Sequence, residues 1–329
     1  MSAEITERGA GAKRLLLLGG TGTIGRAVLG AAAQAGHEVV CFSRGGAQGE
    51  MPEGAVLRRG DVTRAGELAA KGIKGERFDA VISCMASRSG APGDAWAIDH
   101  DAHLEVLRAA QAAGIGQFIL LSAICVQRPK LAFQHAKLAF ERVLAESGMR
   151  YSIVRPTAYF KSLSGQLDRL RAGKPFLLFG DGRLTACKPI SDGDLAAYML
   201  RCLDAPDLQN RVLPIGGPGP AITPVEQGER LFELLGKPPK FARVPVAMMD
   251  AIIGGLSLAG AVSPKARAKA ELARIGRYYA TESMLVYDAE AGRYAPEATP
   301  ETGSETLFDF YARLVRGEVS VARGDHAVF

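Results

Sequence analysis

The sequence predicts an α/β fold, a doubly wound parallel sheet with a smaller C-terminal domain for a substrate. Two observations lead to this prediction. Short apolar runs alternate with helix-type stretches along the first half of the chain, which is the order of a parallel sheet with helical crossovers. The runs are apolar at nearly every position, as is typical of strands that helices cover on both faces.

The first half supplies six strands and four helices in alternation. We expect strands at 13–18, 38–42, 55–59, 79–84, 118–122 and 151–155. We expect helices at 26–35, 65–70, 101–113 and 131–147. The last two helices are followed by Gly114 and Gly148, since glycine is common just after a helix end, and Pro156 ends the sixth strand.

The second half is less regular. Gly180-Asp181-Gly182 predicts a turn, Ser191-Asp192 caps a helix at 195–202, and 212–215 is a further strand. A loop at 299–303 precedes a final helix at 307–315. We therefore expect a first domain at 13–159 with returning segments at about 186–217, a substrate part at 160–185 and 218–329, and a flexible N-terminus at 1–12.

Composition excludes several classes of protein. The 329 residues are 47% apolar and 23% charged, which is typical of a globular chain with one large domain or two moderate ones. The net charge is only +5 and contains no long basic run, so we expect no nucleic-acid partner. Five scattered cysteines without a C-x-x-C pair predict reduced, mostly buried thiols.

One apolar segment, 246–262, raises the question of a membrane span. Asp250 interrupts it, glycines loosen it, and it is shorter than the roughly 20 residues that a spanning helix needs. We expect no transmembrane span here, but a buried helix or a helix that lines an apolar pocket. The run Leu15–Leu18 is too short for the core of a signal peptide.

A glycine-rich turn joins the first strand to the first helix. Gly19, Gly22 and Gly25 have the spacing G-x-x-G-x-x-G, and Thr21, Thr23 and Ile24 lie between them. Glycines let the backbone approach a pyrophosphate closely, and the helix N-terminus offers free N–H groups to the anion. This strand–turn–helix context predicts a Rossmann-type dinucleotide site.

The end of the second strand indicates which dinucleotide binds. An NAD site usually has a carboxylate there, but this chain has Ser43-Arg44, and an arginine pairs with a 2′-phosphate. The pattern therefore favours NADPH, with Arg44 as a solvated loop charge as the alternative. Asp61-Val62, after the third strand, fits contacts with the adenine ring. Cys84 and Pro156, at the ends of two further strands, are also expected to contact the cofactor.

Several internal stretches are more specific than the glycine motif. They are LLSAICVQ at 120–127, FQHAKLAFE at 133–141, RPTAYFKSL at 155–163, FGDG at 179–182, CKPIS at 187–191 and YATESM at 279–284. With these stretches, residues 13–315 resemble the atypical or extended short-chain dehydrogenase/reductase superfamily. Within it, they look like the 3,8-divinyl (proto)chlorophyllide a 8-vinyl reductases.

The resemblance implies a departure from the usual catalytic pair. The superfamily works with Tyr-x-x-x-Lys, and here Lys137 stands at the lysine position but Phe133 replaces the tyrosine. Loss of the phenol argues against alcohol–ketone chemistry, where an oxygen must be protonated. It is compatible with reduction of a C=C bond, because the resulting carbanion is delocalised into a conjugated ring.

The resemblance implies that Lys137 anchors the nicotinamide ribose, and the proton donor stays open between Lys137 and Tyr159. For Tyr159, a plain packing role is the alternative. Ser122 ends the fifth strand and is expected to line the cofactor site. Phe133, Phe160 and Phe179 are the expected substrate contacts; with 241–262 they either form an apolar slot for a flat tetrapyrrole or build a second core.

Two histidines, His100 and His103, stand three residues apart near a helix start. No third ligand has matching spacing, so we expect helix capping and solvated histidines and no metal site.

The function that follows is NADPH-dependent reduction of the C8 vinyl group of divinyl chlorophyllide a, or of divinyl protochlorophyllide a, to ethyl. The alternatives are another atypical C=C reductase, similar to isoflavone reductases, and a non-catalytic NADP-sensing or assembly protein. We expect a location in the bacterial cytoplasm or the plastid stroma, with peripheral contact to a photosynthetic membrane where the pigment is handled.

Overall fold

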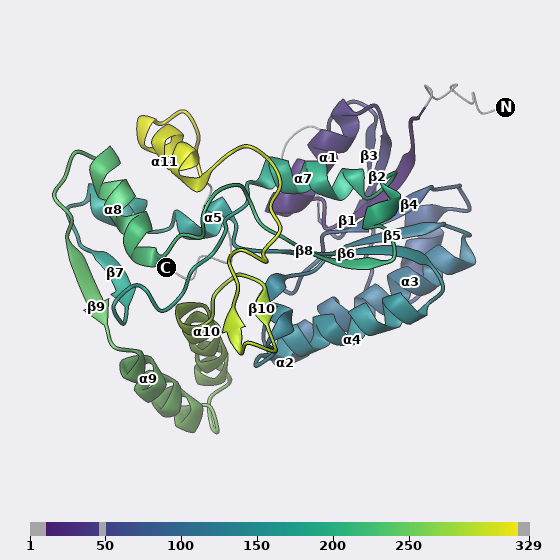
Figure 1. The fold of residues 1–329 in the computed structure, drawn as a ribbon. Helices are drawn as coiled ribbons and strands as arrows, with labels where there is room; N and C mark the ends of the chain where they lie inside the picture. Colours follow the sequence, from purple (N-terminus) through teal and green to yellow (C-terminus); the bar gives the residue numbers. More distant parts are fainter. Residues whose placement is uncertain (1–10, 46–50, 322–329) are drawn as a thin grey trace.

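A seven-stranded parallel sheet forms the centre of the molecule (Figure 1). The computed structural model describes residues 11–45 and 51–321, so most of the expected flexible N-terminus lies outside the described residues. The strands run in the order β3-β2-β1-β4-β5-β6-β8, and every neighbouring pair is parallel. Their bounds are β1 Arg14–Leu18, β2 Glu38–Ser43, β3 Ala55–Arg59, β4 Ala80–Ser83, β5 Gln117–Leu121, β6 Arg150–Pro156 and β8 Arg211–Ile215. This order is that of the doubly wound nucleotide-binding sheet extended by one strand.

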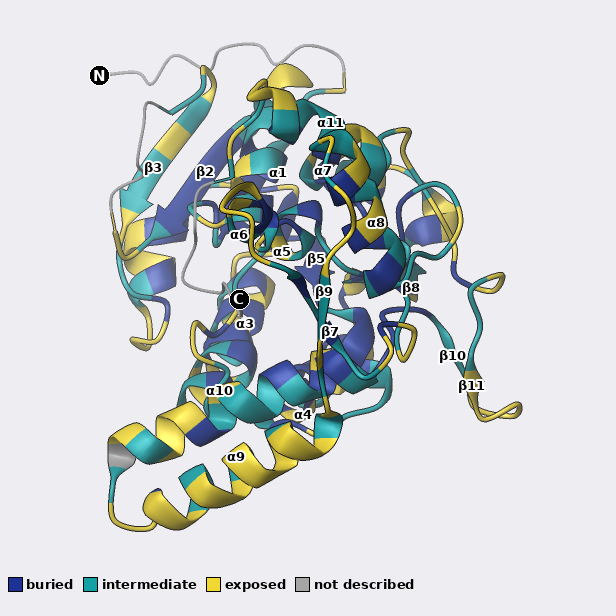
Figure 2. Cartoon of the chain, turned by 90° about the vertical axis from the view of Figure 1, so that its left-hand side faces the viewer, coloured by how far each residue is buried: buried dark blue, intermediate teal, exposed yellow. Residues whose placement is uncertain are grey.

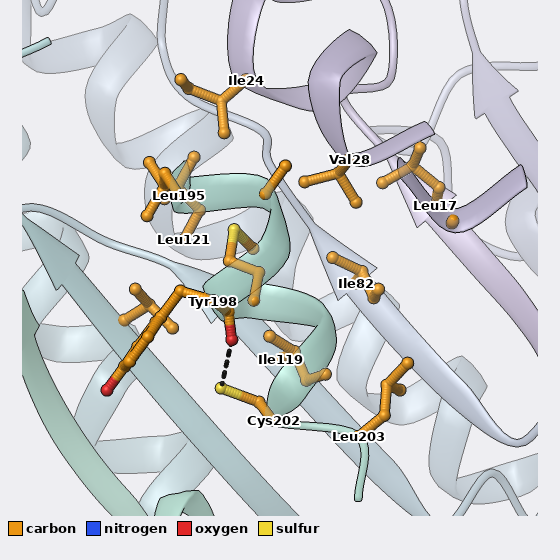
Figure 3. Close-up of a cluster of buried hydrophobic side chains, with 14 of the residues drawn as sticks. Leu17, Ile24, Val28, Ile82, Ile119, Leu121, Leu195, Tyr198, Cys202 and Leu203 are labelled. Atoms are coloured by element: carbon orange, nitrogen blue, oxygen red, sulfur yellow. Dashed lines mark hydrogen bonds between the residues drawn. The ribbon is translucent and has the colours of Figure 1, made fainter. Parts of the chain in front are cut away.

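Helices cover both faces of the sheet. The helices α1 (Thr23–Gln34) and α7 (Asp192–Arg201) pack on one face, and α3 (His103–Ala112) and α4 (Ala132–Glu146) pack on the other. Leu15 and Leu17 of β1 belong to the first core, and Leu16 and Leu18 to the second, because successive side chains of a strand point to opposite faces. Figure 3 shows the first core, in which Val28 of α1 and Leu195 of α7 meet strand residues such as Ile82.

Shorter segments connect these elements. They are the π-helical segments Leu68–Ile73 and Trp96–Ala102, the helix α2 (Pro92–Ala95) and the 3-10 turns Ile124–Gln127 and Pro206–Leu208. The helix expected at 65–70 is thus a π-helical segment three residues further along. The other expected elements of the first half agree with the structure to within a few residues at each end.

The rest of the chain has an apolar core of its own. This core contains Phe160, Phe176, Phe232 and Tyr311. It is built from α5 (Phe160–Leu163), α6 (Leu167–Arg171), β7 (Phe176–Phe179), α8 (Pro224–Leu234), β9 (Phe241–Val244) and α11 (Leu307–Arg316). β7 pairs with β9 in a small parallel sheet, and β10 (Tyr287–Asp288) pairs with β11 (Arg293–Tyr294) in an antiparallel ribbon. The exact division into domains stays a prediction.

The segment at 246–262 differs from the expectation. It forms the helix α9 (Val246–Ala259), which pairs with α10 (Pro264–Thr281), and none of the α9 residues is buried. Figure 2 shows α9 along the outer edge of the molecule, coloured mostly as exposed. The expectation of a buried helix is therefore wrong, and α9 does not build the second core. No helix among the described residues is long and apolar enough to cross a bilayer.

Candidate functional site

The first βα turn is shaped by two glycines that no other residue can replace without movement. Gly19 has φ +73°, and a Cβ at this position would lie 2.6 Å from the carbonyl carbon of Cys84. A Cβ on Gly25 would lie 2.1 Å from the carbonyl oxygen of Gly19. The turn is therefore pressed against the end of β4 and against the start of α1. This is the close packing that brings a backbone next to a pyrophosphate.

The N-terminus of α1 is left open for an anion. Gly22 is the N-cap residue and has no side chain to satisfy the N–H groups of the first turn. Nζ of Lys161 lies 3.1 Å from Oγ1 of Thr23, the first residue of the helix. A lysine ammonium and a helix N-terminus attract the same negatively charged group. The arrangement fits the pyrophosphate of a dinucleotide, and Lys161 is a contact that the sequence analysis did not single out.

Asp192 adds an acidic group within electrostatic reach of Lys161. Burial raises the pKa of this carboxyl, while the charge of Lys161 works in the opposite direction. One of its oxygens, Oδ1, is buried without a hydrogen-bond partner. Thr23 holds the ammonium of Lys161 at the edge of the glycine turn, within electrostatic reach of the Asp192 carboxyl.

The residues that we expect to bind the adenosine part of the cofactor lie at the ends of β2 and β3. Arg44 is exposed directly after β2, and Asp61 follows β3. Burial acts to raise the pKa of Asp61, but hydrogen bonds from Thr63 and the charges of Arg44 and Arg64 lower it overall. Arg44 and Asp61 therefore lie within electrostatic reach of each other, as one nucleotide contacting both would require. Ser43 is half-buried, and Val62 is part of the core below.

Lys137 is bound to a carboxylate that the sequence analysis did not connect with it. Nζ of Lys137 lies 2.9 Å from Oδ1 of Asp99, and both side chains are buried. The backbone N–H of Ser87 also donates to Oδ1 of Asp99 at 3.3 Å, whereas Oδ2 has no partner. Nothing in the local sequence around Asp99 shows that a residue of α4 lies against it.

The two histidines are not the solvated pair that we expected. His103 is buried, with Nε2 at 2.9 Å from Oγ of Ser83 and Nδ1 at 2.8 Å from the carbonyl oxygen of Ile98. Burial, followed by the charge of Lys137, lowers the pKa of His103 to about 4. The ring is therefore neutral at pH 7 and forms part of the packing under Lys137. His100 lies 2.7 Å from Asp101, and no cluster of three or more His, Cys, Asp or Glu side chains suited to a metal occurs in the described ranges.

Phe133 occupies the position one turn before Lys137 and contacts α10. A Cβ on Gly90 would lie 2.8 Å from Cδ1 of Ile275 and 3.6 Å from Cδ1 of Phe133, so these two side chains meet over the same glycine. Both belong to a small apolar cluster that includes Cys125. Where the superfamily has a phenol, this chain therefore has a ring packed in an apolar wall.

Ser122 takes part in a hydrogen-bond network beneath the candidate site. Its hydroxyl donates to Oε1 of Glu141, and Arg155 donates to both carboxylate oxygens of Glu141. All three residues come from the carboxyl-end region of β5 and β6 and the facing turn of α4, and Pro156 closes β6 next to them. This network fixes the strand ends under the site, and its direct contact with a cofactor stays a prediction.

Two tyrosines lie near Cys125, from opposite parts of the chain. Burial, followed by the nearby Cys84, Asp192 and Cys125, raises the pKa of Tyr159, so its phenol is protonated at neutral pH. The hydroxyl of Tyr279 on α10 lies 3.9 Å from Sγ of Cys125, and this side chain is 39% exposed. Burial of its phenol raises the pKa of Tyr279 as well, with further contributions from Cys125 and Tyr159.

The contacts of α10 bring together stretches that are distant in sequence. The hydroxyl of Tyr278 donates to the carbonyl oxygens of Cys125 at 2.9 Å and of Arg128 at 3.2 Å. Nη1 of Arg128 lies 2.8 Å from Oε2 of Glu282. The stretches 120–127 and 279–284, which both carry the family resemblance, therefore form one wall of the candidate site.

The other two predicted substrate contacts lie in the second unit. Phe160 is 3% exposed, and its ring centroid is 5.4 Å from that of Phe310. Phe179 is half-buried at the end of β7. These positions give Phe160 a packing role, and contact of either ring with a substrate stays a prediction.

Comparisons with known proteins agree with this geometry. Residues 19–206 match a family model described as NAD(P)H-binding. The chain is 45% identical to the chloroplastic divinyl chlorophyllide a 8-vinyl-reductase of Oryza sativa subsp. indica, over 96% of this chain and 82% of that protein. It is 46% identical to the protein of the same name from Zea mays, over the same shares. A photosystem II assembly factor of Synechocystis is 26% identical over 72% of each chain.

Solved structures show the same fold at low identity. A UDP-glucose 4-epimerase of Thermus thermophilus in complex with NAD has a TM-score of 0.66 and 18% identity, covering 93% of this chain and all of that chain. An NADPH-dependent quinone oxidoreductase of Escherichia coli complexed with NADPH has a TM-score of 0.66 and 18% identity, covering 92% of this chain and 99% of that chain. Both likenesses show that the chain shares the overall fold of these proteins.

Proposed function

The chain belongs to the family of divinyl chlorophyllide a 8-vinyl reductases, and from this we infer that it uses NADPH to reduce the C8 vinyl group of divinyl chlorophyllide a to ethyl. Divinyl protochlorophyllide a is the second candidate substrate. The observation that carries the inference is 45–46% identity to plant reductases along 96% of the chain. The weaker match to an assembly factor supports a non-catalytic role less well, because a protein that only binds a nucleotide does not need a buried Lys137–Asp99 pair.

The residues of the first domain fit the cofactor. The open N-terminus of α1 and Lys161 would hold the pyrophosphate, while Arg44 would pair with the 2′-phosphate that distinguishes NADPH from NADH. NADPH, when bound, supplies a hydride to the substrate. Lys137, held by Asp99, would anchor the nicotinamide ribose at the end of the sheet.

A proton has to reach the substrate carbon that does not receive the hydride. We assign this role to Lys137 or to Tyr159. Tyr159 is supported by its raised pKa, which keeps the hydroxyl in its protonated form, and by its position near Cys84 at the end of β4. Because Phe133 has no hydroxyl, it serves as an apolar surface for the macrocycle rather than as an acid.

The place of action follows from the substrate. We propose the plastid stroma, or the cytoplasm of a bacterium, as the location, and the chloroplastic relatives support the first. Since the pigment is hydrophobic, we also propose that the protein works at the surface of a photosynthetic membrane without crossing it.

The test is a reaction of the purified protein with divinyl chlorophyllide a and either NADPH or NADH. The product is expected to absorb at shorter wavelength, because one C=C bond leaves the conjugated system, and to carry two additional hydrogens by mass spectrometry. Lys137→Ala is the matched negative control and is expected to lose most of the activity. An unchanged absorption spectrum with the native protein would overturn the substrate assignment.

A further inference from the structure

The outermost part of the molecule is the pair of helices α9 and α10, residues 246–281, here called the α9–α10 hairpin. Its first helix is apolar around its whole circumference, since only Asp250 and Ser257 carry polar side chains. Large apolar side chains are nevertheless exposed, namely Met248 at 48%, Ile252 at 49%, Leu258 at 81% and Val262 at 88%. A helix this apolar normally packs into a core, so side chains that the described residues leave exposed indicate a further binding partner.

The polar side chains of α9 bond to α10. Asp250 pairs with the guanidinium of Arg277, and Oγ of Ser257 accepts a hydrogen bond from Nη2 of Arg274 at 2.7 Å. Nη2 of Arg267 donates to the carbonyl oxygen of Gly260 at 3.2 Å. These contacts join the two helices, while Met248, Ile252 and Leu258 of α9 stay exposed.

Positive charge surrounds the apolar tip of the hairpin. The two most exposed apolar side chains are Leu258, in the last turn of α9, and Val262, in the turn between the helices. Lys265, Arg267 and Lys269 follow directly and are exposed. The hairpin contains five basic and two acidic residues in a chain whose net charge is +5. An apolar tip with a cationic border matches the hydrocarbon boundary and the anionic headgroups of a bilayer surface.

We propose that the α9–α10 hairpin is the docking surface for a membrane that contains anionic lipids. Leu258 and Val262 enter the headgroup region, and Lys265, Arg267 and Lys269 bind lipid phosphates. The inference rests on the proposed work at a membrane surface but not on the reduction itself. A second copy of the chain is a poorer occupant, because a symmetric contact would bring the same positive charges together.

Docking at the hairpin also orients the candidate site. The base of α10 carries Ile275, which meets Phe133 over Gly90, and Tyr278, which is bonded to Cys125. The helix that contacts the bilayer at one end thus forms a wall of the site at the other. A hydrophobic pigment would reach the site along a surface next to the lipid rather than through water.

The test is flotation of the full-length protein with vesicles, without pigment or nucleotide. Vesicles of phosphatidylcholine alone are compared with vesicles that also contain phosphatidylglycerol, at low and high salt. The native protein is expected to float with the anionic vesicles and to be released by salt. The double variant Leu258→Ser/Val262→Ser is expected to bind at least tenfold more weakly, since two apolar side chains no longer leave water on binding. Lys265→Glu/Lys269→Glu is expected to lose the preference for anionic lipid.

A matched control is Leu184→Ser, an exposed apolar side chain outside the hairpin at 49% exposure, which is expected to bind vesicles like the native protein. The proposal would be overturned if the native protein did not bind anionic vesicles. It would also be overturned if the hairpin variants bound as well as the native protein. Equal binding to both kinds of vesicle would overturn the role of the lysines. Light scattering that shows a dimer dissociated by Leu258→Ser/Val262→Ser would assign the surface to a second copy instead. A failed reductase assay with intact vesicle binding would count against the proposed reaction alone.

Discussion

Lys137 and Asp99 form a buried ion pair at the centre of the candidate site, with Nζ of the lysine 2.9 Å from Oδ1 of the aspartate. The lysine comes from α4 and the aspartate from the π-helical segment before α3. A buried pair adds little net stability, because desolvation of the two ions offsets their attraction, but it holds each ion in one place. Asp99 is therefore a positioning residue for the ammonium of Lys137.

Asp99→Asn tests this role. The substitution leaves the lysine buried without its anion, and loss of one partner of a buried pair typically costs about 3–5 kcal/mol of unfolding free energy. We expect a lower melting temperature and a raised KM for NADPH, because the ammonium is no longer held at the ribose position. Thermal unfolding and steady-state kinetics measure the two effects separately.

Two further variants distinguish the effect on the placement of the Lys137 ammonium from the effect on the stability of the fold. Asp101→Asn removes a nearby exposed carboxylate and is expected to leave both values as in the native protein. Asp99→Asn/Lys137→Met removes both charges and is expected to recover stability without activity. Native kinetics in Asp99→Asn would show that Lys137 works without its partner.

Phe133→Tyr restores the phenol of the common catalytic pair. We expect no gain in turnover, because a vinyl group has no carbonyl oxygen for the phenol to protonate. The added hydroxyl also enters the contact with Ile275 over Gly90, so a small loss of stability is expected. The measurement is kcat with divinyl chlorophyllide, with Phe133→Leu as a control for the ring itself. A higher kcat in Phe133→Tyr would contradict the assignment of an apolar role.

The sheet was predictable from sequence because its causes are local. Short apolar runs such as Leu15–Leu18, followed directly by glycines, favour strands covered on both faces, and the glycine turn indicates where the first helix begins. Lys137 was singled out through the family resemblance of the stretch 133–141 and not through local physical chemistry. Its partner Asp99 was not, because the contact depends on how α4 packs against the preceding segment and leaves no mark in either local sequence.

The error at α9 has a different cause. Its apolar composition predicts a helix that is buried away from water. The sequence contains no sign that the other described residues leave this helix uncovered. The contacts of α10 could not be predicted either, because the hydrogen bond from Tyr278 to Cys125 joins residues 153 positions apart in the sequence. Composition predicts that a surface will be covered, whereas only the packing shows whether the chain itself covers it.

The buried His103 gives the protein a defined dependence on pH. Its pKa is about 4 in the folded protein against 6.5 for an unperturbed histidine, so the unfolded chain binds more protons between these values. The free energy of unfolding is therefore expected to fall by up to roughly 3 kcal/mol as the pH drops from 6.5 to 4. Denaturant unfolding at several pH values measures the slope.

His103→Gln is expected to flatten that slope, whereas His135→Gln, at an exposed position of α4, is expected to leave it unchanged. An NMR titration in which the His103 ring takes up its proton near pH 6.5 would show that the ring is not held neutral by burial.

Arg44→Asp tests the choice of dinucleotide. The variant places a carboxylate where we expect the 2′-phosphate, so NADPH binding is expected to weaken by about tenfold to a hundredfold while NADH binding changes little or improves. Binding titrations with both nucleotides give the ratio. Arg142→Asp, an exposed arginine of α4, is the control for the change of net charge. Unchanged affinities in Arg44→Asp would move the 2′-phosphate site elsewhere.

Lys161→Met examines the pyrophosphate in the middle of the dinucleotide, and its effect on the two affinities is expected to differ from that of Arg44→Asp. Nζ of Lys161 lies 3.1 Å from Oγ1 of Thr23 at the open N-terminus of α1, so its expected ligand is the pyrophosphate. NADPH and NADH share that group, and loss of one charge-assisted contact is expected to weaken both by a similar factor of about ten. Lys174→Met, at an exposed position, is expected to change neither affinity. Isothermal titration with both nucleotides distinguishes the two sites: a selective loss of NADPH binding in Lys161→Met would place the 2′-phosphate, and not the pyrophosphate, beside this lysine.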